Sequence, residues 1–359
     1  MVLLAAAAAF LLPSAALAIG DGGKESPGSG DGTRKSVRGG VVGKELVASV
    51  ARSRIRVSYP GGQAAGASVS ALTSVDPDWE PPVCWYEPVF SPRQLKDAVA
   101  TGEGGLVSAH VWWSNRLWVD HYEKGGVTGV GLGSRLPGGG GSGQGYKNYN
   151  LGKKGMFWRS TVRDGMYQDS RAWDCGRVMF WQDAGTLPED ANAPTPETLA
   201  AFAYDKIKVP DTEIELKPTG GSTVNLPTWV WLDEATFDDV TVRAELPGTG
   251  LYAVTTAKPV ALHLEPGTGD AVTFPAGGDC PVNEDGSIGA PYRRGAAGED
   301  PPCGVRYLRA TGSEPYPLTA SVTWGISWEG TGGSAGRLPD GVFEGVRNVA
   351  VQEVQAVNR

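Results

Sequence analysis

The clearest pattern in the chain is a series of short runs, in its C-terminal part, in which apolar and polar residues alternate. A period of two places successive side chains on opposite faces of a strand. In Leu318–Trp328, six apolar residues share one parity, which predicts a strand with one buried face. Similar runs occur at Thr223–Leu232, Val240–Leu246, Leu251–Thr256, Val260–Leu264, Val305–Leu308 and Val346–Val357. About seven strands separated by turn residues predict an antiparallel β-sandwich over residues 211–359.

Residues 76–210 show a mixed pattern and hold most of the tryptophans. Ser91 and Gln94 have the spacing of a capping box, which predicts a helix beginning at Pro92. Thr195-Pro196 predicts the start of a second helix in the same way. Strands are predicted at Leu106–Trp113, Arg116–Tyr122 and Arg177–Trp181. We therefore expect a small α+β domain before the sandwich.

Residues 19–75 contain mostly glycine, serine and charged side chains, with little to bury. Such a composition predicts a disordered, basic linker. Within it, Arg54–Tyr59 alternates with period two and is expected to add an edge strand.

Residues 1–18 are apolar, carry no charged side chain and end in Ala16-Leu17-Ala18. Small residues at these positions are what signal peptidase accepts, so we expect a signal peptide cleaved after Ala18. The alternative is an uncleaved anchor, for which this stretch is marginal in length, since a hydrocarbon core is about 30 Å thick. No later segment approaches a membrane-spanning length.

Composition sharpens this picture. The 52 glycines and 26 prolines indicate many turns, whereas twelve tryptophans indicate that part of the chain buries a core. The four cysteines are even in number and include no Cys-x-x-Cys pair. They allow three disulfide pairings; Cys84–Cys175 with Cys280–Cys303 is favoured because each bond then closes within one expected domain. This usage fits an oxidising compartment outside the cytoplasm.

The charge is unevenly distributed. Residues 19–59 hold eight basic and four acidic residues, which leaves −12 for the rest of a chain whose net charge is −8. An acidic body does not suit a nucleic-acid partner, because phosphates require clustered Lys and Arg. The basic arm could contact an anionic envelope polymer or lipid surface, or simply be a solvated linker.

The segment Val224–Trp231 resembles the Leu-Pro-Thr-Trp-x-Trp sequence of a family of uncharacterised secreted proteins from actinomycetes. Later features also resemble that family: an acidic Gly-rich turn at Glu265–Asp270, the pair Pro291-Tyr292, and Cys303 shortly before Tyr307. The order is also similar to the PKD-type immunoglobulin-like fold, although Leu264 stands where that fold has a tryptophan. The resemblance covers roughly residues 195–357 and implies an immunoglobulin-like sandwich with no agreed activity.

Some members of that family carry nucleotide-binding labels, but this chain lacks a phosphate-binding loop. Neither Gly43-Lys44 nor Gly152-Lys153 has the required Gly-x4-Gly-Lys-Ser/Thr spacing. We therefore expect no nucleotide and no other cofactor.

Catalytic chemistry has few candidates. His110 and His121 match no zinc spacing, so no metal is expected. An acidic pair is the better lead: Asp233 and Asp238 lie near a predicted strand end, and Asp76, Asp78 and Glu80 flank a tryptophan. Two carboxylates about 5–10 Å apart beside aromatic rings would suit glycoside hydrolysis. Acids solvated in turns are the commoner explanation.

Tryptophans provide the candidate binding surface. Trp112, Trp113 and Trp118 lie on one predicted hairpin and could form an aromatic platform for a sugar or a protein, or fill a core. By parity, Trp229 with Trp231 and Trp324 with Trp328 are expected to face the sandwich core.

These patterns favour an exported, non-catalytic binding or structural module at the cell envelope or outside the cell. Its expected partner is an envelope or surface protein, or a cell-wall polymer. The alternative is a polysaccharide-acting hydrolase that uses Asp233 and Asp238.

Overall fold

The computed structural model describes residues 53–60, 69–101, 119–125, 146–177, 179–210, 215–232 and 239–354. Contacts divide the chain into Met1–Lys44 and Glu45–Arg359, and all described residues belong to the second unit. The expected leader with Ala18, residues 19–52 of the expected linker, Trp112, Trp113, Trp118, Asp233 and Asp238 lie outside the described residues.

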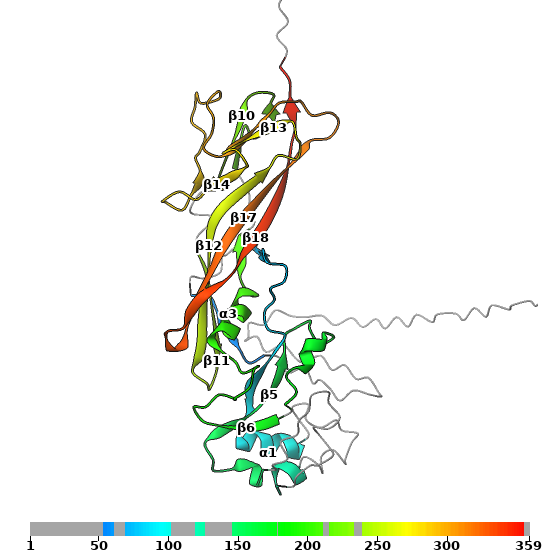
Figure 1. Cartoon of the computed structure of the whole chain (residues 1–359), viewed down its shortest axis with the longest axis vertical. Coiled ribbons are helices and arrows are strands. Elements are labelled where there is room, and N and C mark those ends of the chain that lie inside the picture. The colour runs from blue at the N-terminus through cyan, green and yellow to red at the C-terminus, as the bar shows by residue number, and fades with distance from the viewer. Residues whose placement is uncertain are drawn as a thin grey trace, which may run out of the picture. The chain divides into compact units, whose positions relative to one another are not determined.

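The protein is mainly β, and its largest element is a seven-stranded antiparallel sheet (Figure 1). Its strands run in the order β1 (Arg56–Ser58), β11 (Val240–Leu246), β12 (Leu251–Glu265), β17 (Tyr316–Gly330), β18 (Ala335–Val349) and β3 (Thr73–Ser74), with β14 (Asp279–Pro281) paired to β12. Burial alternates along β11, β12 and β17, as the sequence pattern predicts.

A five-stranded antiparallel sheet shares the core of the large one. It contains β13 (Ala271–Phe274), β16 (Gly304–Tyr307), β10 (Pro227–Leu232) and β15 (Ile288–Gly289), with β8 (Glu215–Lys217) paired to β10. Val230 and Val305 of this sheet belong to the same buried cluster as Leu262, Val322 and Trp324 of the large sheet. The prediction of a mainly β protein with packed antiparallel sheets is confirmed.

Two details of the strand prediction are wrong. The runs ending at Thr256 and beginning at Val260 form the single strand β12, because Pro259 sits at a β-bulge rather than in a turn. Trp229 and Trp231 share a face, as predicted, but it is the outer face of β10; Val230 and Leu232 face the common core instead.

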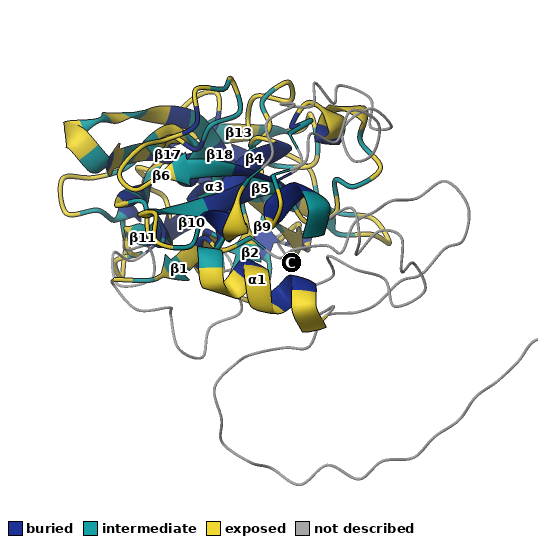
Figure 2. Ribbon diagram, turned by 90° about the horizontal axis from the view of Figure 1, so that it is seen from below, coloured by how far each residue is buried: buried dark blue, intermediate teal, exposed yellow. Residues whose placement is uncertain are grey.

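A separate three-stranded sheet consists of β4 (Cys84–Phe90), β5 (Gly155–Val162) and β6 (Met179–Asp183). Helix α1 (Pro92–Thr101) packs on it through Leu95, Ala98 and Val99 and leaves its other side exposed (Figure 2). The capping box is present, since Gln94 accepts from the Ser91 N–H at 2.9 Å and Ser91 accepts from the Gln94 N–H at 3.3 Å.

Helix α3 (Pro196–Tyr204) packs on β11, β12 and β17. The helix begins at Pro196, as predicted from Thr195-Pro196, and the structure adds a capping box between Thr195 and Thr198. Buried Thr255 of β12 donates to the carbonyl of Ala200 at 3.1 Å, which fixes the helix to the sheet. The prediction of a strand ending at Tyr122 is wrong, because residues 119–122 are helical.

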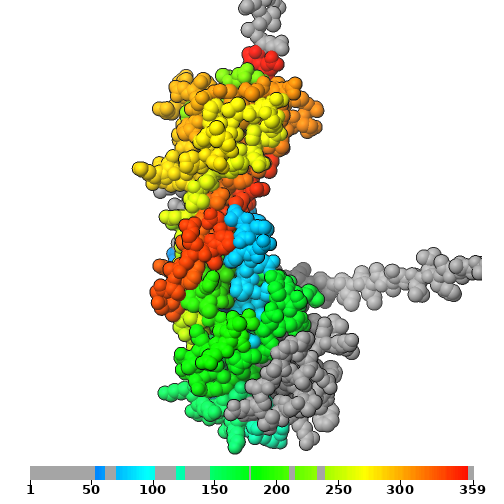
Figure 3. All heavy atoms as spheres, viewed as in Figure 1, coloured from blue at the N-terminus to red at the C-terminus, as the bar shows by residue number. Residues whose placement is uncertain are grey.

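The remaining elements are short. They are β2 (Val69–Ala71), β7 (Lys208–Pro210), β9 (Ser222–Thr223), β19 (Val351–Gln352), η1 (Asn148–Asn150), η2 (Ser170–Trp173) and η4 (Thr331–Gly333). Strands β1, β2 and β3 fall within the segment expected to be a linker. The segment that carries β3 lies against β18 (Figure 3). Within the described ranges, no helix is long and apolar enough to cross a membrane.

Candidate functional site

Several acids proposed for catalysis have structural roles. Asp76 accepts from the backbone N–H of Asp78 at 3.0 Å, which is the geometry of an Asx turn. Glu80 forms ion pairs with Arg163 at 3.5 Å and Arg171 at 2.8 Å. Asp233 and Asp238 lie outside the described residues, so the acidic pair stays a prediction.

The described histidines lie apart from each other in the fold. His121 is buried and packs edge-on against Tyr122 and Tyr146. His263 is exposed on β12, and its Nδ1 lies 2.7 Å from a carboxylate oxygen of Asp279 on β14. Among the residues that the structure describes, no group of His, Cys, Asp and Glu could hold a metal ion.

The sequence reasoning missed a buried carboxylate, Glu87, in the middle of β4. Its side chain is 1% exposed and accepts three hydrogen bonds of 2.6 Å: from the Ser53 hydroxyl, the Arg54 N–H and the Trp85 Nε1–H. Arg159 is its cross-strand neighbour on β5; burial lowers the pKa of Arg159, and the charge of Glu87 opposes that shift. A charge in such a position must be paired and hydrogen-bonded to be tolerated.

Glu87 holds residues 53–59, which we call the clasp segment. After the two bonds to Glu87, Ile55 enters the main core, and β1 adds to the edge of β11. The Tyr59 hydroxyl then donates to the carbonyl of Lys206 at 3.3 Å. The clasp segment thus connects the three-stranded sheet, the seven-stranded sheet and the residues after α3.

A pocket of 240 Å³ lies beside this carboxylate. It is lined by Ser53, Trp85, Val162, Arg163, Asp164, Phe202 and Lys206. Two of these residues, Ser53 and Trp85, also donate to Glu87, so the buried carboxylate fixes part of the pocket wall. The rings of Trp85 and Phe202 meet edge-to-face with centroids 5.7 Å apart.

Two cations line the pocket. Arg163 follows β5, and its side chain is 15% exposed; the Lys206 side chain is 35% exposed, and its ammonium lies 5.1 Å from the centre of the Phe202 ring. Each has a carboxylate partner, Glu80 at 3.5 Å and Asp205 at 2.6 Å. A guanidinium has five N–H donors and an ammonium three, so both retain donors for a ligand.

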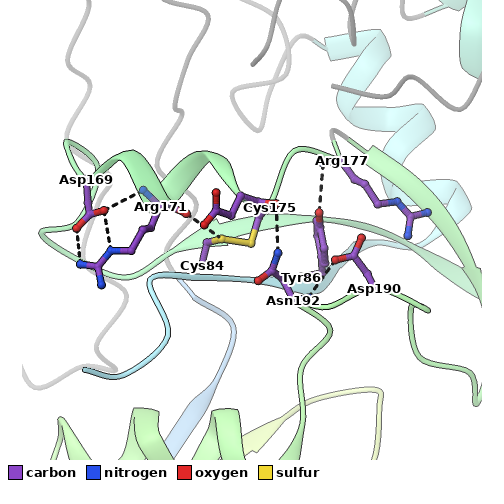
Figure 4. The surroundings of a disulfide bond; sticks show 9 residues. Cys84, Tyr86, Asp169, Arg171, Cys175, Arg177, Asp190 and Asn192 are labelled. Atoms are coloured by element: carbon purple, nitrogen blue, oxygen red, sulfur yellow. Dashed lines mark hydrogen bonds and ion pairs between the residues drawn. A yellow bond between two sulfur atoms is a disulfide. The ribbon is translucent and has the colours of Figure 1, made fainter. Parts of the chain in front are cut away.

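A disulfide supports the ion pairs behind Arg163. The bond Cys84–Cys175 joins the start of β4 to the loop after η2, and the Cys84 sulfur contacts the carbonyl of Arg171 (Figure 4). Arg171 also pairs with Asp169 at 2.6 Å and lowers the pKa of that carboxyl to about 2. The network therefore fixes Glu80 and Arg171 beside the pocket.

The second disulfide, Cys280–Cys303, closes a loop that covers the outer face of β10. Trp229 and Trp231 are buried there against Tyr292 and Ala296 of the loop. Gly289 has φ +73° and comes so close to β10 that a Cβ would lie 2.4 Å from the Val230 carbonyl oxygen. These two disulfides are the pairings favoured from the sequence, and they indicate an oxidising, extracytoplasmic environment.

One sequence signal could have drawn attention to Glu87. It is the single charged residue in the run Cys84–Phe90, which is otherwise apolar. A charge inside a strand that buries both faces requires a partner. The pocket residues Arg163 and Phe202 are far apart in the sequence and carry no such signal.

No protein-family model, no curated protein and no solved structure significantly matches this chain.

Proposed function

We propose that this chain is an exported, non-catalytic binding or structural module, held near the cell envelope or a surface assembly by its basic N-terminal arm. The observation that carries the proposal is the clasp segment. Ser53 and Arg54 donate hydrogen bonds to the buried carboxylate of Glu87 at the point where the arm joins the folded body. A pulling force on the arm would therefore be transmitted to this buried site. Two disulfides, which persist in an oxidising exterior, stabilise that body.

For residues 211–359 we propose a PKD-type immunoglobulin-like arrangement and kinship with secreted actinomycete proteins. The shared core of two antiparallel sheets and a disulfide within this part support the proposal. An experimental structure whose strand order differs from that of the PKD fold would contradict it.

The functional test uses the full chain as bait in a pull-down from the envelope fraction of the producing cell. We expect one specific partner or polymer to be recovered, and recovery to fall when Arg34, Lys35 and Arg38 of the arm are replaced by Gln. In the matched control, Lys153, Lys154 and Lys217 of the body become Gln, which removes the same charge. Equal recovery by the two triple variants would contradict a tethering role for the arm.

A parallel glycan-degradation screen tests the hydrolase alternative. Turnover by the full chain that disappears in Asp233→Asn or Asp238→Asn would replace the proposed module with an enzyme. Recovery of the partner that is lost when Trp112 and Trp113 become Ala, in a protein that stays folded, would place the contact on residues 106–122.

A further inference from the structure

The pocket beside the clasp segment combines three features that one class of ligand satisfies. Arg163 and Lys206 provide positive charge, Trp85 and Phe202 provide aromatic wall, and Ser53 and Asp164 provide oxygen atoms. Cations pair with a carboxylate, aromatic rings pack on the C–H face of a sugar, and oxygen acceptors take hydrogen bonds from hydroxyl groups. We propose that this pocket binds an acidic saccharide through its carboxylate.

The size of the pocket limits what enters it. Its volume of 240 Å³ lies just below the range of roughly 300–1,000 Å³ typical of small-molecule sites. The pocket therefore takes one sugar ring rather than a length of polymer. That ring is either free or the end of an envelope polysaccharide.

Arg163 is the residue expected to hold the carboxylate. Its side chain is partly accessible, and the contact of its Nη2 with Glu80 is long at 3.5 Å, so the terminal nitrogens retain donors for a ligand. A planar guanidinium with unused donors matches a carboxylate better than an ammonium does. The Lys206 ammonium lies over the Phe202 ring, 5.1 Å from its centre, and adds positive charge from the residues after α3.

The lining argues against a fatty acid as the ligand. An acyl chain would bury Asp164 and Ser53 against hydrocarbon and leave their oxygens without water. Hydroxyl groups on a sugar would instead donate to Asp164, whose present contact with the Tyr167 hydroxyl is long at 3.4 Å.

Calorimetric titration of the full, oxidised chain with glucuronate tests this proposal, with glucose as the neutral probe. We expect saturable binding of glucuronate, with glucose about tenfold weaker or worse, because a hydrogen bond to a charged group contributes roughly that factor. Arg163→Gln and Lys206→Gln should each weaken glucuronate binding by about tenfold. A polyuronate titrated in parallel distinguishes a polymer end from a free sugar.

Arg309→Gln is the matched control, because Arg309 also pairs with a carboxylate, Asp270 at 3.2 Å, but is exposed and does not line the pocket. Its affinity for glucuronate should match that of the unmodified chain. If the chain binds neither uronate probe, or if Arg163→Gln and Arg309→Gln weaken binding equally, the pocket is not the site. Lys206 is partly exposed, so Lys206→Gln keeps the test decisive should Arg163→Gln fail to fold.

The inference deepens the binding role proposed above and rests on it, yet the two can fail separately. Recovery of an envelope partner by a chain that binds neither uronate probe would overturn the pocket and leave the module standing. Glucuronate turnover by the chain would overturn the module.

Discussion

The paired large sheets and the small three-stranded sheet are stabilised in different ways. The large sheets share one extensive apolar core, in which Leu262, Val322 and Trp324 are fully buried. The three-stranded sheet has two small clusters, one around Leu95 and Phe157 and the other around the Cys84–Cys175 bond. It adds a cross-link and a buried carboxylate to a core that is modest in size.

The difference shows how apolar area and specific bonds substitute for each other. A large core stabilises its sheets through burial, at roughly 25 cal/mol per Å² of apolar surface. A small core gains less stabilisation from the burial of apolar surface. A disulfide then contributes more to whether the region folds. Glu87 and the clasp segment connect the two regions, and the proposed binding pocket lies at that connection.

The largest effect is expected from the disulfide of the small sheet. The chain-entropy relation gives a stabilisation of about 4.6 kcal/mol for the sequence separation of 91 between Cys84 and Cys175, against about 3.4 kcal/mol for the separation of 23 between Cys280 and Cys303. Calorimetry measures the loss of stability in two double variants, Cys84→Ala/Cys175→Ala and Cys280→Ala/Cys303→Ala. A larger loss from the second pair would contradict the comparison.

Glu87→Gln should destabilise the connection between the two regions by about 3 kcal/mol, because Arg159 loses the charge that compensates it. Limited proteolysis should then cleave near the clasp segment sooner. Glu344→Gln is the control, since Glu344 is exposed and accepts a long bond of 3.3 Å from the Ser321 hydroxyl. Similar denaturation midpoints for the two variants would show that Glu87 holds nothing in place.

The two capping boxes offer a smaller, paired test. Thr195→Ala should lower stability by about 1 kcal/mol through α3 on the large sheet, and Ser91→Ala by a similar amount through α1 on the small sheet. Hydrogen exchange should assign each loss to its own region. Thr195→Ser retains the hydroxyl and should behave like the unmodified chain; if it does not, the cap is not the cause.

These helices also show what the sequence can predict. A capping box joins residues only three apart, so Ser91 with Gln94 is visible in the sequence, as is the helix start at Thr195-Pro196. The alternation in β17 likewise follows from one buried face. Parity alone does not say which face another segment covers, which is why the prediction for Trp229 and Trp231 was wrong.

The pocket could not be predicted for a related reason. Ser53, Trp85, Arg163 and Phe202 come from four segments whose meeting depends on how α3 and β5 are placed in the fold. No sequence periodicity describes such a meeting. Pro259 illustrates the converse error, since a residue that usually interrupts strands is accommodated by a bulge in β12.

The smallest expected effect is a loss of stability at acidic pH. Arg171 lowers the pKa of Asp169 to about 2, below the value near 3.9 of an unfolded chain. A lowered folded-state pKa stabilises the folded form above about pH 4, and that contribution is lost as the pH falls toward about 2. Asp169 is solvent-screened, so the change is slight. NMR titration of its carboxyl, with Asp169→Asn as reference, measures it; a midpoint near 4 would contradict the pairing.

Hydrogen exchange with and without a strong thiol reductant tests most directly whether the two regions are held by different means. Reduction should increase amide exchange in β4, β5 and β6, while β12 and β17 stay protected by their core. Equal loss of protection in both regions, or unchanged protection in β4–β6 after both disulfides are shown to be reduced, would contradict this account.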